Sequence, residues 1–148
     1  RETVFNWLGP LLPGASCLDL YAGSGVLGFE ALSRGAERAV LVESDAAAVA
    51  AMQAVRDELS AAAEIVRADA ADFLAGAEAH RFDIVFVDPP YAAEVRPILE
   101  ALVPALRTGA RVYLERERGD SWPELPKLSW VRRAAAGGVE FGLAELSD

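Results

Sequence analysis

Short apolar runs alternate along the chain with longer segments in which apolar residues recur at helical spacing. This alternation is typical of a parallel sheet whose strands are joined by helices. The helical spacing is clearest in 46–60, where Val49, Met52 and Val55 share one stripe and Asp45 precedes the segment as a possible cap. The pattern predicts strands at 17–21, 39–43, 64–67, 82–87 and 111–115, and helices at 25–33, 46–60, 70–75 and 95–106.

The pattern changes after Gly119, where a stretch with two prolines follows. Two further strands are predicted around 130–131 and at 139–146, and Gly137-Gly138 can form the hairpin turn between them. Strands joined by so short a turn run antiparallel. We therefore expect one α/β domain over 1–148, with five parallel strands, helices on both faces and a C-terminal antiparallel strand pair.

The composition limits the classes of protein that remain. A chain of 148 residues that is 53% hydrophobic can bury one core, which excludes intrinsic disorder. No apolar run reaches the about 18 residues of a spanning helix, and the opening residues do not resemble a signal peptide, so no membrane association is expected. The single cysteine, Cys17, favours a reducing, cytoplasmic location. A net charge of −9 argues against binding nucleic acid by phosphate neutralisation alone.

A glycine-rich turn, Asp-Leu-Tyr-Ala-Gly-Ser-Gly-Val-Leu-Gly at 19–28, connects the first strand to the first interior helix. Glycines there allow a tight turn, close approach of a ligand and close packing of helix on strand. Asp19 could contact a cationic group or order the loop. Glu43 ends the second strand 20 residues after Gly23, where a carboxylate can bind ribose hydroxyls. These features predict a nucleotide-type cofactor and leave NAD and S-adenosylmethionine (SAM) as alternatives to a turn without a ligand.

Asp69 and Ala70 follow the third strand. The Asp69 carboxylate and the next backbone N–H could hold an adenine through its amino group and ring nitrogen. Aspartate is equally favoured as the cap of a helix, and both roles can hold together.

The most informative motif is Asp88-Pro89-Pro90-Tyr91, which follows the apolar fourth strand and so lies at the carboxyl edge of the sheet. The prolines lack backbone donors and give a rigid rim of carbonyl groups. An amino group conjugated to a planar base is a poor nucleophile. Hydrogen bonds from its two N–H groups to the Asp88 carboxylate and the Pro89 carbonyl would favour a pyramidal nitrogen, while Tyr91 could stack on the base. The motif predicts methylation of an amino nitrogen, with a rigid turn into the next helix as the structural alternative.

No metal site is predicted, because the sequence contains one histidine, His80, and one cysteine.

The order of these motifs resembles that of class I SAM-dependent methyltransferases acting on amino nitrogens of nucleic acids. Segments 1–8 (RETVFNWL), 22–25 (AGSG), 30–34 (EALSR) and 85–91 (VFVDPPY) more narrowly resemble the bacterial 16S ribosomal RNA guanine-N2 methyltransferase family, with a likeness that extends to about Val139. The resemblance implies a Rossmann-like class I methyltransferase fold, SAM as cofactor and a guanine of 16S ribosomal RNA as substrate. It also implies that Asp88, Pro89, Pro90 and Tyr91 form the catalytic site, and that Asp19, Tyr21, Gly23, Gly25, Glu43, Ser44, Asp69 and Ala70 form the SAM site.

Members of that family carry a basic segment ahead of RETxFNWL. This chain begins at the motif, so a processed or truncated N-terminus is expected. We further expect a cytoplasmic monomer that acts on a flipped-out base of 16S ribosomal RNA in the assembled or assembling small subunit. Surface arginines near the end of the sheet are candidate phosphate contacts, namely Arg116, Arg118, Arg132 and Arg133.

Three other functions remain open from the residues alone. The same chemistry would serve an amino methyltransferase of DNA or of a protein side-chain amide. An NAD-linked oxidoreductase is disfavoured because the sequence offers no evident acid–base pair for hydride transfer. A non-catalytic assembly factor that binds SAM or RNA is the third alternative.

Overall fold

The computed structural model describes residues 2–90 and 94–147. The helices are α1 (Glu2–Leu8), α2 (Val26–Ser33), α3 (Ala46–Leu59), α4 (Ala70–Ala75) and α5 (Val95–Leu102), and short 3-10 turns occur at η1 (Gly9–Leu11) and η2 (Val103–Ala105). The strands are β1 (Ser16–Leu20), β2 (Arg38–Glu43), β3 (Ala63–Arg67), β4 (Phe82–Val87), β5 (Leu106–Glu117), β6 (Leu128–Ala136) and β7 (Val139–Leu146).

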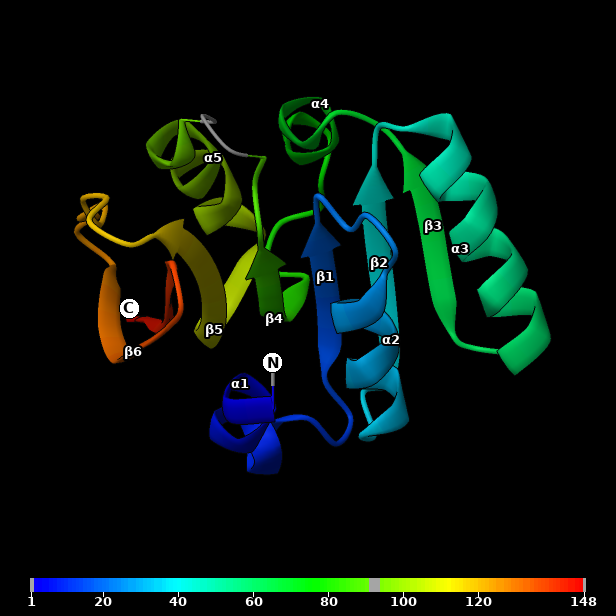
Figure 1. Cartoon of the computed structure of the whole chain (residues 1–148), viewed down its shortest axis with the longest axis horizontal. Helices are drawn as coiled ribbons and strands as arrows, with labels where there is room; N and C mark the ends of the chain where they lie inside the picture. Colours follow the sequence, from blue (N-terminus) through cyan, green and yellow to red (C-terminus); the bar gives the residue numbers. More distant parts are fainter. Residues whose placement is uncertain (1, 91–93, 148) are drawn as a thin grey trace.

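These strands form a seven-stranded sheet in the order β3-β2-β1-β4-β5-β7-β6 (Figure 1). The first five pair in parallel, and β7 runs antiparallel to both β5 and β6. From β1 the strand order proceeds to β2 and β3 on one side and to β4 and β5 on the other. This change of direction places a topological switch point at the carboxyl ends of β1 and β4. The predicted fold class, a mostly parallel α/β sheet with an antiparallel C-terminal pair, is confirmed.

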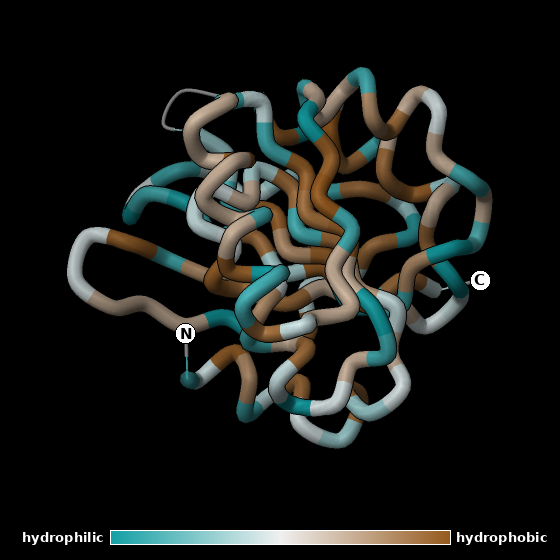
Figure 2. Tube along the Cα trace, turned by 90° about the vertical axis from the view of Figure 1, so that its right-hand side faces the viewer, coloured by the Kyte–Doolittle hydropathy of each residue, from teal (hydrophilic) through white to brown (hydrophobic). Residues whose placement is uncertain are grey.

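Two cores form on opposite faces of the sheet because side chains alternate along each strand. Leu18 and Leu20 of β1 pack in the core that α4 and α5 cover. Cys17, from the same strand, packs in the core that includes residues of α1, α2 and α3. The strands at the centre are accordingly the most hydrophobic part of the chain, with polar residues concentrated in the outer helices and loops (Figure 2). The alternation decides which face every side chain near the strand ends will occupy.

The structure departs from the predicted boundaries mainly in the C-terminal half. The fifth strand spans 106–117 instead of 111–115, because it pairs with β4 from Leu106 and with β7 as far as Glu117. The last helix ends at Leu102 instead of residue 106, and a 3-10 turn containing Pro104 follows it. The predicted hairpin turn is confirmed, since Ala136 pairs with Val139 across Gly137-Gly138.

Other expectations concern residues away from the sheet edge. Cys17 is buried, and burial together with the Asp83 and Asp19 charges raises its pKa to about 12, so it packs as a small apolar side chain. Among the described residues, no helix combines the length and apolar character needed to cross a bilayer. Within 2–90 and 94–147, no three His, Cys, Asp or Glu side chains are grouped so that they could hold a metal ion.

Candidate active site

A cavity of about 440 Å³ opens at the carboxyl edge of the sheet, beyond the ends of β1, β2 and β4. Its volume lies in the range of small-molecule binding sites. Most of the residues around it are ones that the sequence predicts for the site, and Val42 and Ala68 are additions. The lining consists of Tyr21, Val42, Glu43, Ser44, Ala68, Asp69, Ala70, Asp88 and Pro90.

The glycine turn begins with three residues in left-handed backbone conformations: Tyr21 (φ 58°), Gly23 (φ 57°) and Gly25 (φ 80°). A non-glycine residue such as Tyr21 adopts this conformation at a cost of about 1–2 kcal/mol, which the surrounding contacts must offset. A Cβ atom added to Gly23 would meet nothing within 4 Å. The backbone at Gly23 is therefore open to close approach by a ligand, as the motif predicts.

Gly25 has a different role. A Cβ atom there would lie 2.8 Å from both Leu41 Cδ2 and Phe29 Cε2, and 2.9 Å from Met52 Sδ. Gly25, like Gly23, is absent from the cavity lining, but protein atoms fill the space beside Gly25 whereas the space beside Gly23 is open. The observed role of Gly25 is the close packing of α2 on β2.

Asp19 lies beneath the turn, with 2% of its surface exposed. Its Oδ2 atom accepts a hydrogen bond of 3.0 Å from the backbone N–H of Gly28. Burial raises the pKa of Asp19 to about 8, the Asp88 and Glu43 charges add to the rise, and the Gly28 hydrogen bond opposes it. Of the two roles predicted for Asp19, the structure displays the ordering of the loop and the start of α2.

Glu43 is held by two backbone donors. Its Oε1 accepts from Gly23 N at 2.8 Å and its Oε2 accepts from Asp45 N at 2.9 Å. Each carboxylate oxygen has a second lone pair, so ribose hydroxyls can bind without displacing either contact. The predicted cap of α3 is confirmed, because Asp45 Oδ2 accepts from Ala48 N at 2.9 Å.

Asp69 occupies the N-cap position of α4, but its side chain forms no capping hydrogen bond. Asp69 therefore stands at the predicted cap position, but its carboxylate does not cap the helix. The carboxylate lines the cavity beside Ala70, whose N–H lies in the first turn of α4, where backbone donors lack partners within the helix. The pKa of Tyr21 is raised, first because the side chain is partly buried and second because the Asp69 charge lies nearby. The pair Asp69 and Ala70 keeps the donor and acceptor that an adenine requires.

Asp88 follows a strand whose residues Ile84–Val87 are at most 1% exposed. The residue itself is exposed, as is Pro90, and both line the cavity. Partial burial of its carboxyl, the charge of Glu115 and a hydrogen bond between the two side chains together raise the pKa of Asp88 to about 6. Asp88 is therefore mainly ionised at neutral pH. Tyr91, the predicted stacking residue, lies outside the described residues.

Glu115 is a carboxylate next to Asp88 that the sequence prediction did not single out. It lies near the end of β5, next along the sheet from Asp88, and its Oε2 accepts a hydrogen bond of 3.4 Å from Tyr113 Oη. Tyr113 is buried between Phe86 and Phe141, with ring centroids 6.2 and 6.4 Å away. The available signal was position, because the fifth parallel strand ends at the same edge of the sheet as the fourth.

The candidate phosphate contacts divide by what they touch. Arg118 Nε donates to Gly137 O at 2.9 Å, and Arg133 lies 4.5 Å over the Trp122 ring, so both support the terminal hairpin. Arg132 is exposed. Arg116 lines a groove of about 610 Å³ between the start of α5 and the loop after β5. Its buried Nε atom has no hydrogen-bond partner among the described residues.

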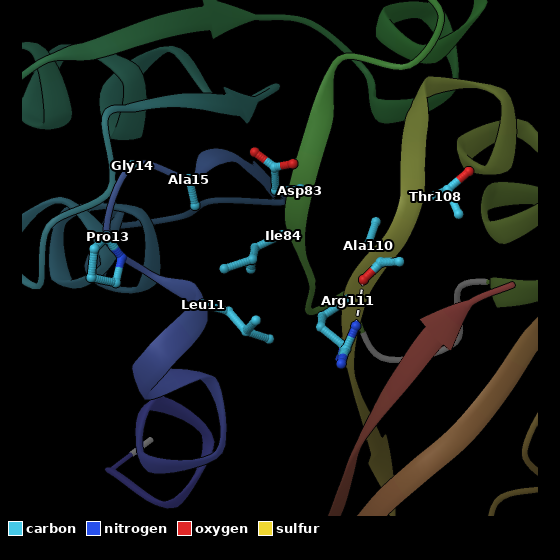
Figure 3. A pocket seen from close by; sticks show the side chains of 10 residues that line it. Leu11, Pro13, Gly14, Ala15, Asp83, Ile84, Thr108, Ala110 and Arg111 are labelled. Carbon is cyan, nitrogen blue, oxygen red and sulfur yellow. Dashed lines mark hydrogen bonds between the residues drawn. The ribbon is translucent and has the colours of Figure 1, made fainter.

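A separate cavity of about 290 Å³ lies at the amino ends of the strands (Figure 3). Asp83 and Arg111 line it, together with Leu11, Pro13 and the backbone near Gly109. Asp83 Oδ2 is already bound by Ser16 N at 2.8 Å and by Arg107 Nη1 at 2.9 Å. This cavity is at the opposite edge from Asp88 and contains none of the predicted site residues.

Comparison with known proteins finds one family and relatives that share a name. Residues 1–145 match the protein family described as conserved hypothetical protein 95. The chain is 40% identical over 151 residues to ribosomal RNA small subunit methyltransferase D of Escherichia coli K12, an alignment that covers 97% of this chain and 74% of that protein. Identity to the protein of the same name from Haemophilus influenzae is 36%, covering 97% and 78%.

Solved structures agree with these relatives. The yhhF protein of Escherichia coli matches with a TM-score of 0.93 at 37% identity, covering 100% of this chain and 86% of that chain. A SAM-dependent methyltransferase from Aquifex aeolicus matches with a TM-score of 0.78 at 14% identity, covering 98% and 88%, and shows a shared fold.

Proposed function

The chain belongs to the family of ribosomal RNA small subunit methyltransferase D, and on that premise we propose that it methylates the exocyclic N2 of a guanine in 16S ribosomal RNA with SAM as methyl donor. The observation that carries the proposal is the composition of the cavity at the carboxyl edge. Among the residues that the structure describes, three carboxylates line it, those of Glu43, Asp69 and Asp88, and no arginine or lysine does.

That charge distribution favours SAM over NAD. SAM carries a sulfonium and an ammonium, whereas NAD carries a pyrophosphate, which sites of this type receive at a helix N-terminus or with cationic side chains. Carboxylates within about 4–6 Å of a cation stabilise both charges. The residues present fit the parts of SAM: Glu43 fits the ribose hydroxyls, Asp69 and Ala70 fit the adenine, and the open backbone at Gly23 allows close approach.

The roles of the chain's own groups in the reaction follow from the same geometry. Bound SAM supplies an electrophilic methyl group on sulfur, and S-adenosylhomocysteine leaves when the carbon–sulfur bond breaks and the carbon–nitrogen bond forms. Asp88 accepts a hydrogen bond from one N–H of the guanine amine and the Pro89 carbonyl accepts from the other, which turns the nitrogen lone pair toward the methyl group. Because an ionised carboxylate accepts strongly, Asp88 also stabilises the positive charge that develops on the nitrogen. The proton then leaves to Asp88 or to water.

The substrate is large in relation to the site, and we place it along the carboxyl edge. The groove that Arg96 and Arg116 line adjoins the start of α5, close in sequence to the Asp88 motif. Two arginines there offer contacts for phosphates on either side of a flipped-out guanine. With a net charge of −9, recognition is expected to depend on the shape of the assembled or assembling subunit more than on phosphate charge.

The proposal is tested by incubating the protein with methyl-labelled SAM and small ribosomal subunits that lack the modification, with naked 16S RNA and DNA in parallel. The products are digested to nucleosides and separated. We expect label in N2-methylguanosine from the subunits, and less than about a hundredth of the rate for Asp88→Ala, since removing one donor or acceptor from a transition state costs about 10²–10³. Glu78→Gln removes an exposed carboxylate from the loop between α4 and β4, away from the cavity and the groove, and serves as the control.

Each alternative has its own outcome. Label in DNA or protein would replace the substrate class but keep the chemistry. Binding of NAD but not SAM would overturn the cofactor assignment. An Asp88→Ala protein as active as the parent would mean that the motif does not carry the reaction.

A further inference from the structure

Asp88 directly follows β4, and Glu115 lies at the matching position on the neighbouring strand β5. The last parallel pair between β4 and β5 joins Val87 to Leu114, so the residues that follow each of them lie side by side beyond it. Side chains alternate along a strand, and these two share the face of Phe86 and Tyr113. The fold therefore brings two carboxylates together at the carboxyl edge, on one face of the sheet.

The Glu115 carboxyl lies against aromatic side chains and has limited contact with water. Tyr113 Oη donates to its Oε2 at 3.4 Å, and Phe141 is its register partner on β7. The Phe141 ring in turn packs against Trp7 of α1, with centroids 5.7 Å apart. The residue is half-buried, with Tyr113 as a neutral donor and Asp88 as a neighbour. Because each carboxylate oxygen has two lone pairs, Glu115 keeps capacity for a further donor.

We propose that Glu115 selects guanine, by accepting a hydrogen bond from the N1–H of the base whose 2-amino group binds Asp88. The inference rests on the proposed function and adds to it a residue that reads the identity of the base. Neither the sequence motif nor the chemistry of methyl transfer requires a second carboxylate next to Asp88.

The bases that carry an amino group differ in the hydrogen-bonding group next to it. Guanine presents two adjacent donors on one edge, N1–H and the 2-amino group. Adenine and cytosine present a ring-nitrogen acceptor beside their amino group. A fixed carboxylate at that position binds the N1–H of guanine and is repelled by the lone pair of the other two bases. A polar group left unpaired in this way gives strong discrimination, up to about 10⁴-fold in comparable sites.

The state of Asp88 agrees with this assignment. The Glu115 charge contributes to raising the pKa of Asp88 to about 6, because two like charges lie close together. Two adjacent N–H donors arriving together would relieve that repulsion. A base with one donor and one acceptor would leave one carboxylate without a partner.

The test uses 2,6-diaminopurine, which keeps the 2-amino group of guanine but has an acceptor at N1. The base is introduced into 16S RNA at the guanine that product mapping identifies, and the RNA is reconstituted into small subunits. The parent protein is expected to methylate guanine at least about 100-fold faster than diaminopurine, measured as kcat/KM. For Glu115→Gln, whose amide can donate to N1, the preference should fall below about tenfold. Tyr113 can still donate to the amide oxygen, so the fold is expected to persist.

Glu117→Gln is the matched control, since Glu117 is exposed on the same strand two residues farther along. It should keep the parent's preference for guanine. Two results would overturn the inference while leaving the proposed function intact. One is a parent protein that methylates diaminopurine as fast as guanine, a result that needs no variant. The other is a folded Glu115→Gln protein, with the parent's SAM affinity, that still prefers guanine 100-fold. A parent that methylates neither base would instead contradict the proposed function itself.

Discussion

Two glycines of the same turn, Gly23 and Gly25, should respond differently to replacement by alanine. Both have positive φ angles, 57° and 80°, so each alanine would be strained by about 1–2 kcal/mol. Only Gly25 is also closely packed, with Leu41, Phe29 and Met52 atoms within 2.9 Å of where its Cβ would lie. Overpacking adds about 1–3 kcal/mol. We therefore expect Gly25→Ala to lower the free energy of unfolding by about 2–5 kcal/mol, and Gly23→Ala by about 1–2 kcal/mol.

Binding should follow the opposite order. The Cβ of Gly23→Ala meets nothing within 4 Å of the protein and would occupy the space in which a ligand approaches the backbone. We expect this variant to bind SAM at least about tenfold more weakly, equivalent to about 1.4 kcal/mol. Gly25→Ala, wherever it remains folded, should lose less affinity because its added methyl points into the core.

Urea denaturation measures the first effect and isothermal titration with SAM measures the second. The slope of the unfolding free energy against urea must stay constant for the comparison to hold. Gly76→Ala is the control, since Gly76 has an ordinary φ of −106° and open space around it, so its stability should change by less than about 1 kcal/mol. The reasoning would be refuted by a Gly25→Ala protein as stable as Gly23→Ala, or by unchanged SAM binding in Gly23→Ala.

Three further predictions concern other parts of the molecule. Because an ionised Asp88 is the stronger acceptor, kcat/KM, which reports the free enzyme, should rise with pH up to about 6 and level off above it. Glu115→Gln should shift this rise to lower pH, and an unchanged midpoint would contradict the carboxylate pair. The buried Asp19 has a pKa of about 8 in the fold against an ordinary 3.8, so its contribution to stability is complete below about pH 4 and is lost as pH rises toward 8, by up to about 1.4 kcal/mol per pH unit. Asp19→Asn should flatten this dependence in urea titrations at pH 5 and 8. Phe86→Ala should cost about 3–5 kcal/mol of unfolding free energy in the same assay, since Phe86 is fully buried between Phe5 and Tyr113.

The parallel part of the fold could be predicted closely because its signals are local. The fourth strand and the helix at 70–75 have the predicted bounds, since each consists of a short apolar segment with polar or small residues at its ends. The C-terminal half was predicted less well. The extra length of β5 comes from pairing with β4 at Leu106 and with β7 at Arg116 and Glu117, and pairing between strands far apart in sequence leaves no local pattern.

The residues of the site were predictable where they belong to a motif. Glu43, Asp69 and Asp88 each end a parallel strand or follow one directly, and all three line one cavity. Their individual roles were harder to separate. Asp19 and Gly25 look like ligand contacts in the sequence, yet one holds the start of α2 and the other allows α2 to pack on β2. Glu115 was missed because its significance depends on the register between β4 and β5, which only the assembled sheet provides.

The folded sheet distinguishes between SAM and NAD, which the sequence motifs alone do not. A glycine turn and an acid at the end of the second strand suit both cofactors, so the turn alone leaves the question open. In the fold, Glu43, Asp69 and Asp88 converge on one cavity, and over 2–90 and 94–147 no lysine or arginine joins its lining. A pyrophosphate in that position would face carboxylates, whereas a sulfonium would be stabilised by them. The chain is acidic overall, which argues against a simple nucleic-acid binder. At this edge of the sheet the same excess of carboxylates favours a cationic cofactor.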